Sequence, residues 1–112
     1  MSVVESKEGD VLVLVLEGRI TFGHGDTEAG TAIRRALAAG ERKILVDMGG
    51  VPMVDSAGLG EIVSAYAWAH RSHAAMKLSG LSERVRELLR MTRLGGVFDV
   101  FDERSAAIAS FG

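Results

Sequence analysis

The sequence predicts an α/β domain with a mixed β-sheet, in which an N-terminal antiparallel hairpin is followed by largely parallel strands and about four helices cover the sheet. Two apolar segments near the N-terminus are separated by a turn-like segment, which indicates the hairpin. From residue 27 onward, helical periodicity alternates with short apolar runs, as is typical of parallel strands joined by helices. With 112 residues, the chain has the length of one domain, which we expect to span residues 1–112.

Composition and charge argue against several classes of function. The chain is 47% hydrophobic and 25% charged, and it contains no cysteine, so neither disulfides nor thiolate metal sites are expected. The formal net charge of −2 gives no electrostatic reason for direct nucleic-acid binding. The N-terminus lacks a signal-peptide pattern, and no apolar run approaches the roughly 20 residues of a membrane span. We therefore expect a cytoplasmic protein without a membrane partner.

The hairpin is predicted from two strands, Val3–Ser6 and Val11–Glu17. We expect Lys7–Asp10 to form a loop longer than two residues between them. The second strand is apolar throughout, which predicts cover on both of its faces. Gly18 then ends or bends this strand, and Arg19–Ile20 is expected to continue it briefly.

The first helix is predicted over Thr27–Ala39, after the glycine-containing loop Thr21–Asp26. Asp26 is the expected N-cap, because a short carboxylate can accept hydrogen bonds from free N–H groups of the first turn. Gly40 is the expected stop. The apolar stripe of this helix consists of Ala29, Ile33, Ala36 and Leu37.

The segment Lys43–Gly60 is the part of the chain on which the functional prediction depends. It begins with a strand at Ile44–Val46 and continues as a loop over Asp47–Val54, which holds the only proline. Asp55 and Ser56 stand directly before the next helical pattern. A hydroxyl placed there meets free backbone N–H groups and the positive end of a helix dipole, so Ser56 is the candidate working residue.

The helix that follows is predicted over Ala57–His73. Gly58 and Gly60 lie in its first turn, although glycine is about 1 kcal/mol less favourable than alanine in a helix. We infer that something approaches this backbone closely. The stripe expected to face the sheet consists of Leu59, Ile62, Val63, Tyr66 and His70.

Trp68 is about half a turn out of phase with that stripe and shares the other face with Glu61, Ser64 and Ala65. Two interpretations are open. The third helix covers the indole, or the indole marks a partner or homodimer surface, because aromatic residues are enriched in interface cores.

The C-terminal third is predicted to contain two strands and two helices. Ala75–Ser79 is a strand, and Ser82 caps a helix that runs to Thr92 and stops at Gly95-Gly96. Val97–Phe101 is the last strand. Asp102 is expected to cap a short terminal helix that carries Ala106, Ala107 and Ile108.

Taken together, five segments of the chain resemble the STAS domain of bacterial anti-sigma-factor antagonists, and the similarity covers nearly the whole chain. The most specific is Val54–Gly60, VDSAGLG, because it stands between a strand ending in aspartate and a helix. The others are the hairpin ending VLVLEGRI, the pair Val46-Asp47, the strand Lys77–Gly80, and Arg90–Leu94 followed by Val97-Phe98.

The resemblance implies a small non-enzymatic switch that regulates sigma-factor-dependent transcription. In the family, the serine matching Ser56 is phosphorylated by a partner that is both serine kinase and anti-sigma factor and has a histidine-kinase-like ATPase fold. The unphosphorylated protein binds this partner and frees a sigma factor, and a metal-dependent serine phosphatase resets the system. We expect no catalytic residue, cofactor or metal in this chain. Together with Trp68, the expected partner-binding residues are Asp55, Ser56, Ala57, Gly58, Leu59, Gly60 and Glu61.

The chain departs from the family pattern after the strand that ends Gly18-Arg19-Ile20. Family members usually carry an aspartate soon after this strand, whereas this chain has Thr21–Gly25, TFGHG. One interpretation is that the variant loop marks a subgroup with a different partner.

Other interpretations stand beside this one. Ser56 could serve only as a helix cap, and the protein could be a constitutive STAS scaffold or a regulatory subunit of a sensory or transporter assembly. Asp47 and Asp55 could form a catalytic pair, but no other active-site residues accompany them. We expect Asp47 to be structural and Asp55 to fix the loop or present Ser56.

Enzymatic and ligand-binding alternatives have weaker support. The chain lacks the G-x-S-x-G motif of a serine hydrolase, and Gly23-His24-Gly25 matches no phosphate-binding motif. The three histidines, at positions 24, 70 and 73, lack the spacing of metal ligands. A cluster of basic residues is expected to be a solvated helix face: Arg84, Arg86, Arg90 and Arg93, with Glu83 and Glu87 among them.

Overall fold

The computed structural model describes residues 1–112 and contains a five-stranded sheet in the order β1-β2-β3-β4-β5. Strand β1 is antiparallel to β2, and every other neighbouring pair is parallel. This confirms the predicted α/β fold with a mixed sheet. The strands are β1 (Ser2–Glu8), β2 (Val11–Glu17), β3 (Lys43–Gly50), β4 (Ala75–Ser79) and β5 (Val100–Phe101).

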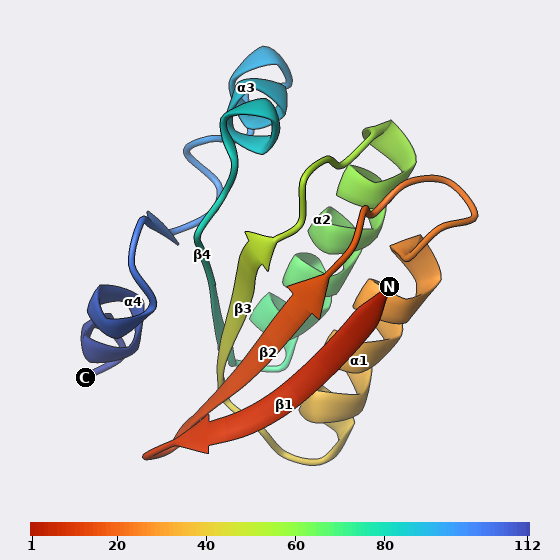
Figure 1. Ribbon diagram of the computed structural model, residues 1–112. Coiled ribbons are helices and arrows are strands. Elements are labelled where there is room, and N and C mark those ends of the chain that lie inside the picture. Colours follow the sequence, from red (N-terminus) through yellow and green to blue (C-terminus); the bar gives the residue numbers. More distant parts are fainter.

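Four helices accompany the sheet, and Figure 1 shows that the third of them lies beyond the strand ends and not over a face. Helices α1 (Asp26–Ala38) and α2 (Ser56–Arg71) pack side by side on one face. Helix α3 (Glu83–Met91) adds Val85 and Leu89 to the same core, and α4 (Arg104–Ser110) covers the other face. None of the four combines the length and apolar character that a membrane span needs.

Strand β2 is covered on both faces, as its continuous apolar run predicts. Leu12, Leu14 and Leu16 belong to the larger core beneath α1 and α2. Val11 and Val13 belong to a smaller core with Leu45 and Ala107, beneath α4. The β2 side chains alternate between the two cores because successive residues of a strand point to opposite faces.

The hairpin turn is tighter than expected. The strands pair from Ser2↔Glu17 to Glu8↔Val11, so only Gly9 and Asp10 form the turn, and the predicted longer loop is wrong. Gly9 has a φ of 63°, a conformation that glycine adopts without steric penalty. Glycine at the first central position therefore allows a two-residue turn.

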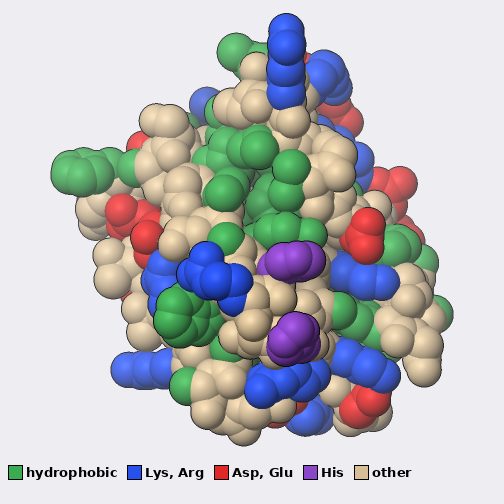
Figure 2. Space-filling view, turned by 180° about the vertical axis from the view of Figure 1, so that it is seen from behind, with side chains coloured by type: hydrophobic (Ala, Val, Ile, Leu, Met, Phe, Trp, Pro, Cys, Tyr) green, Lys and Arg blue, Asp and Glu red, His purple; other side chains and the backbone are tan.

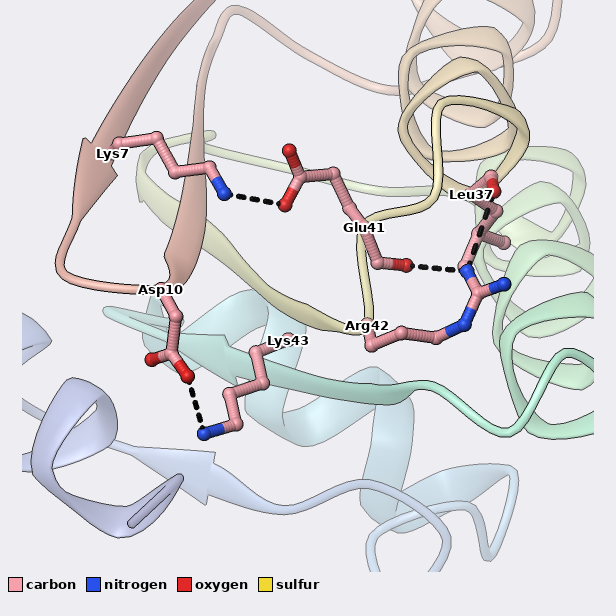
Figure 3. A network of polar contacts seen from close by, with 6 residues as sticks. All are labelled: Lys7, Asp10, Leu37, Glu41, Arg42 and Lys43. Atoms are coloured by element: carbon pink, nitrogen blue, oxygen red, sulfur yellow. Dashed lines mark hydrogen bonds and ion pairs between the residues drawn. The ribbon is translucent and has the colours of Figure 1, made fainter.

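A network of polar contacts ties the hairpin tip to the α1–β3 connection (Figure 3). The Lys43 ammonium lies 2.7 Å from the Asp10 carboxylate, and Lys7 lies 2.8 Å from Glu41. The Arg42 guanidinium donates to the Glu41 carbonyl oxygen at 2.9 Å. Lys43 holds the pKa of Asp10 below its usual range. This network lies where β2 and β3 begin, at the opposite end of these parallel strands from Ser56.

Several predicted element ends are confirmed and others are wrong. Gly40, with a φ of 94°, ends α1 as predicted, and the Ser82 hydroxyl accepts from the Val85 N–H at the start of α3. Gly25, rather than Asp26, is the residue before α1, and no side chain caps that helix. Arg93 has a φ of 61°, so α3 ends before Gly95-Gly96.

Three further boundaries were predicted wrongly. Strand β3 runs to Gly50, because it pairs with both β2 and β4, so Asp47 lies inside the strand and not in a loop. The predicted Arg19–Ile20 strand is reduced to one bridge between Ile20 and Val54. The last strand is only Val100–Phe101, and Glu103 rather than Asp102 precedes α4.

Candidate functional site at the start of α2

The candidate site lies at the carboxyl ends of β2 and β3, where the chain leaves the sheet. The Ile20 N–H donates to the Met53 carbonyl oxygen at 3.1 Å, and the Asp55 N–H donates to the Ile20 carbonyl oxygen at 3.3 Å. These bonds place the loop after Ile20 beside the start of α2. Ser56 is the first residue of α2, and it is exposed.

Asp55 is the N-cap of α2. One carboxylate oxygen, Oδ1, accepts from the Gly58 N–H at 2.8 Å, and the other, Oδ2, accepts from the Phe22 N–H at 3.0 Å. These two bonds, the Gly58 bond first, hold the pKa of Asp55 below its usual range. The interpretation of Ser56 as the cap of this helix is therefore wrong. Asp55 performs that role and fixes the loop as well.

The two glycines of the first turn have different surroundings. A methyl group on Gly58 would overlap the carbonyl oxygen of Ile20, whereas nothing lies within 4 Å of the same position on Gly60. The close approach inferred from the sequence is therefore correct for Gly58 alone. The group that approaches is the protein's own backbone. The absence of a side chain at Gly58 therefore allows the start of α2 to lie against the backbone of Ile20.

The loop that departs from the family pattern presents an aromatic ring. Thr21 and His24 exchange both backbone hydrogen bonds, each at 2.8 Å, so Phe22 and Gly23 form the tip of a closed turn. The Phe22 residue is 79% exposed. Neither the periodicity nor the motifs of the sequence pointed to this residue. A large apolar side chain inside a glycine-containing loop was the signal that could have found it.

Trp68 is 48% exposed and lies about 18 Å along α2 from Ser56, at about 1.5 Å per residue. The Arg71 guanidinium lies 5.1 Å from the indole centroid. The alternative in which α3 covers the indole is wrong. Trp68 is thus open to solvent but distant from the other predicted partner-binding residues.

The predicted division of α2 into two faces is partly wrong because α1 packs along it. Ala65 is fully buried, and Arg34 of α1 lies 3.3 Å from Glu61 and donates to the Ser64 hydroxyl at 3.1 Å. His70, expected to face the sheet, is exposed. Figure 2 shows this side of the molecule, where hydrophobic side chains gather beside histidine side chains and Lys and Arg side chains lie around them.

Asp47 and Asp55 do not form a pair. The Asp47 carboxylate, on the α4 face of β3, accepts from Arg104 Nε at 2.7 Å and from the Gly49 N–H at 2.9 Å. Asp55 instead binds Gly58 and Phe22. Asp47 is therefore a structural residue that joins α4 to β3. No group of three or more His, Asp or Glu side chains converges on a possible metal position.

A surface groove of about 470 Å³ lies between the β3–α2 connection and α3. Four apolar residues, Met53, Val54, Leu88 and Met91, line it. Charged residues of α3 complete its rim: Glu83, Arg84 and Glu87. The groove provides an apolar surface beside the segment that leads to Ser56.

Comparison with known families identifies the family to which this sheet and helix start belong. Residues 3–107 match the family model described as STAS domain. The chain belongs to the STAS domain family. The match includes β1 from its second residue onward, the other four strands, and the whole segment from Asp47 to Ser56.

Known proteins resemble this STAS domain along its full length. A Bordetella bronchiseptica protein, BtrV, described as a candidate anti-sigma factor antagonist, is 23% identical, with 99% of this chain and 95% of BtrV covered. A candidate anti-sigma factor antagonist of Thermotoga maritima has the same fold, with a TM-score of 0.88, 22% identity, and 96% and 92% coverage. The phosphorylated form of the Bacillus cell fate determinant SpoIIAA gives a TM-score of 0.75, 16% identity, and 99% and 100% coverage.

Proposed function

We propose that this STAS domain is an anti-sigma factor antagonist whose binding to its partner is controlled by phosphorylation of Ser56. One observation carries the proposal: Ser56 is exposed at the first position of α2, directly after a cap that leaves its hydroxyl free of the capping role. The names of BtrV and of the Thermotoga protein support the antagonist function, and the phosphorylated SpoIIAA structure supports control by phosphate.

The proposed modification changes the charge of the surface around Ser56. A kinase transfers the γ-phosphoryl group of ATP to Ser56 Oγ, the hydroxyl proton leaves, and ADP is released. Phosphoserine carries a charge of about −1.5 to −2 at pH 7. This charge adds to that of Asp55, which is partly exposed and whose ionised form is favoured by the Gly58 and Phe22 N–H groups. A partner surface shaped for a neutral hydroxyl then meets two adjacent anions and binds more weakly.

The proposed partners follow the family pattern. One is a serine kinase that is also the anti-sigma factor and has a histidine-kinase-like ATPase fold, and the other is a serine phosphatase that resets the switch. The antagonist itself performs no catalysis. The segment proposed to meet the kinase at the start of α2 consists of Asp55, Ser56, Ala57, Gly58, Leu59, Gly60 and Glu61, with Trp68 as a second, distant contact. Gly58 and Leu59 are buried, so within this segment they shape the surface and the other residues make the proposed contact.

The modification is tested by incubating the protein with candidate kinases of this fold and ATP, followed by mass spectrometry of its peptides. We expect one phosphoryl group on Ser56 and none in Ser56→Ala. Ser105→Ala is the matched control, because Ser105 is also an exposed serine in the first turn of a helix, α4. Phosphate on Ser105 in place of Ser56 would contradict the proposal.

The switch is tested by measuring the affinity of the kinase for two variants. Ser56→Ala keeps a neutral surface and should bind like the wild type, whereas Ser56→Asp should bind at least tenfold more weakly. Equal affinity for both would support the alternative of a constitutive scaffold or regulatory subunit. Trp68→Ala measures the second contact, since truncation of an aromatic anchor reduces binding strongly only when the partner covers it.

A further inference from the structure

Asp55 connects two segments that are 33 residues apart in the sequence. Its Oδ1 holds the Gly58 N–H of α2, and its Oδ2 holds the Phe22 N–H at the tip of the preceding loop. Ser56 is the next residue in the chain after Asp55. A charge placed on Ser56 is therefore introduced beside the residue that holds the Phe22 tip against the start of α2.

The loop tip that Asp55 holds is a turn closed by backbone hydrogen bonds. The paired bonds between Thr21 and His24 define its shape, and Gly25 packs closely against the Arg19 carbonyl oxygen at the base of the loop. The Phe22 ring projects from this turn and is 79% exposed. Its apolar surface is a suitable contact for a protein partner, because aromatic side chains are enriched where interfaces are fully buried.

We propose that Asp55 is a positioning residue that holds Phe22 as a partner contact beside unmodified Ser56, and that phosphorylation of Ser56 releases Phe22. This inference rests on the proposed function. It adds a second effect of the phosphate to the direct repulsion of the partner. The kinase loses an ordered apolar contact at the same time as it meets the new charge.

The release follows from competition at the start of α2. A phosphate on Ser56 and the Asp55 carboxylate repel each other because both are negatively charged. Both also accept hydrogen bonds from the same few N–H groups of the first helical turn. If phosphate oxygens take the Gly58 N–H, the carboxylate loses the first of its two bonds. It then turns toward water, and the Phe22 N–H loses its acceptor.

The release is tested without a kinase by installing phosphoserine at position 56 during synthesis and measuring amide hydrogen exchange by NMR. We expect the Phe22 amide to exchange about tenfold faster than in the unmodified protein, as for the loss of a hydrogen bond to a charged group. The Val85 amide is the control, because its acceptor is the Ser82 hydroxyl in the cap of α3, in which Asp55 takes no part. Unchanged exchange at Phe22 would overturn the inference.

The Asp55→Asn variant should remove the contact with the Phe22 N–H and keep the helix cap at the Gly58 N–H. Asparagine caps helices about as well as aspartate but offers only one oxygen, so it can hold Gly58 and not also Phe22. We expect fast exchange at Phe22 in unmodified Asp55→Asn, with Gly58 still protected. Protection of both amides would show that Asp55 does not hold the tip.

Phe22→Ala tests the contact in phosphorylation assays with the kinase that modifies Ser56. We expect a KM for this substrate at least tenfold higher with little change in kcat, and His24→Ala, a neighbouring exposed residue, serves as control. An unchanged KM would overturn the partner contact. If no kinase modifies Ser56, the proposed function fails, while the exchange experiment still reports on the Asp55–Phe22 link.

Discussion

The carbonyl oxygen of Ile20 occupies the space in which a side chain on Gly58 would lie. Ile20 follows β2, and Gly58 is the third residue of α2, so this contact sets how closely the helix start approaches the end of the sheet. The two backbone bonds of Ile20, with Met53 and Asp55, hold the same junction. The position of Ser56 therefore depends on a backbone contact that only glycine permits.

Gly58→Ala should lower the free energy of unfolding by about 3 kcal/mol, because the methyl group forces the helix start away from Ile20. Urea denaturation measures the change. Gly60→Ala is the matched control in the same helical turn, where the added methyl meets open space. It should raise stability by about 0.5–1 kcal/mol, since alanine is favoured over glycine in helices. Similar effects for the two variants would contradict the contact.

Ser79→Ala should leave stability unchanged or raise it by up to about 1 kcal/mol. The Ser79 hydroxyl in β4 is 1% exposed and has no hydrogen-bond partner, so its removal loses no bond. Ser110→Ala is the control, because that hydroxyl donates to the Ala107 carbonyl oxygen at 2.6 Å and accepts from Lys77 at 2.9 Å. Thermal unfolding should show a lower melting temperature only for Ser110→Ala. A comparable decrease for Ser79→Ala would mean that the Ser79 hydroxyl has a hydrogen-bond partner after all.

Arg104→Ala should destabilise the protein by about 1–2 kcal/mol, because it leaves the largely buried Asp47 carboxylate without its cation. The effect should be accompanied by loosening of α4, visible as faster amide exchange at Ala107. Arg84→Ala removes an exposed arginine of α3 and should change stability by less than about 0.5 kcal/mol. If both variants unfold at the same urea concentration, the Asp47–Arg104 pair contributes nothing.

The pH dependence of stability should include a contribution from Asp55. Folding lowers the pKa of this carboxyl from its unfolded value of 3.8, because the Gly58 and Phe22 N–H groups favour the ionised form. The stabilisation is therefore present above 3.8 and is lost as the pH falls through the lower folded pKa. Urea midpoints measured from about pH 5 to pH 2 should fall less steeply for Asp55→Asn than for the wild type. Parallel curves would mean that Asp55 is not held as an anion.

The order and type of the elements were predictable from the sequence because they depend on nearby residues. The alternation of apolar runs and helical stripes identified the strands and helices, and the Gly40 stop and the Ser82 cap each act within a few residues. The segment Val54–Gly60 located the candidate site for the same reason, since a strand end, a turn and a helix start follow one another directly.

The contacts across the fold were not predictable in this way. That Asp55 binds Phe22, that Asp47 binds Arg104, and that α1 covers one side of α2 all depend on segments that the sequence separates and the folded chain brings together. Periodicity shows that a helix has an apolar face, but it does not show how many neighbours cover that helix. Local hydrogen bonding and side-chain spacing therefore specified the elements, the Asp55 cap and the position of Ser56. Packing between distant segments gave Asp55 its second contact, with the Phe22 N–H, and left Trp68 and Phe22 exposed.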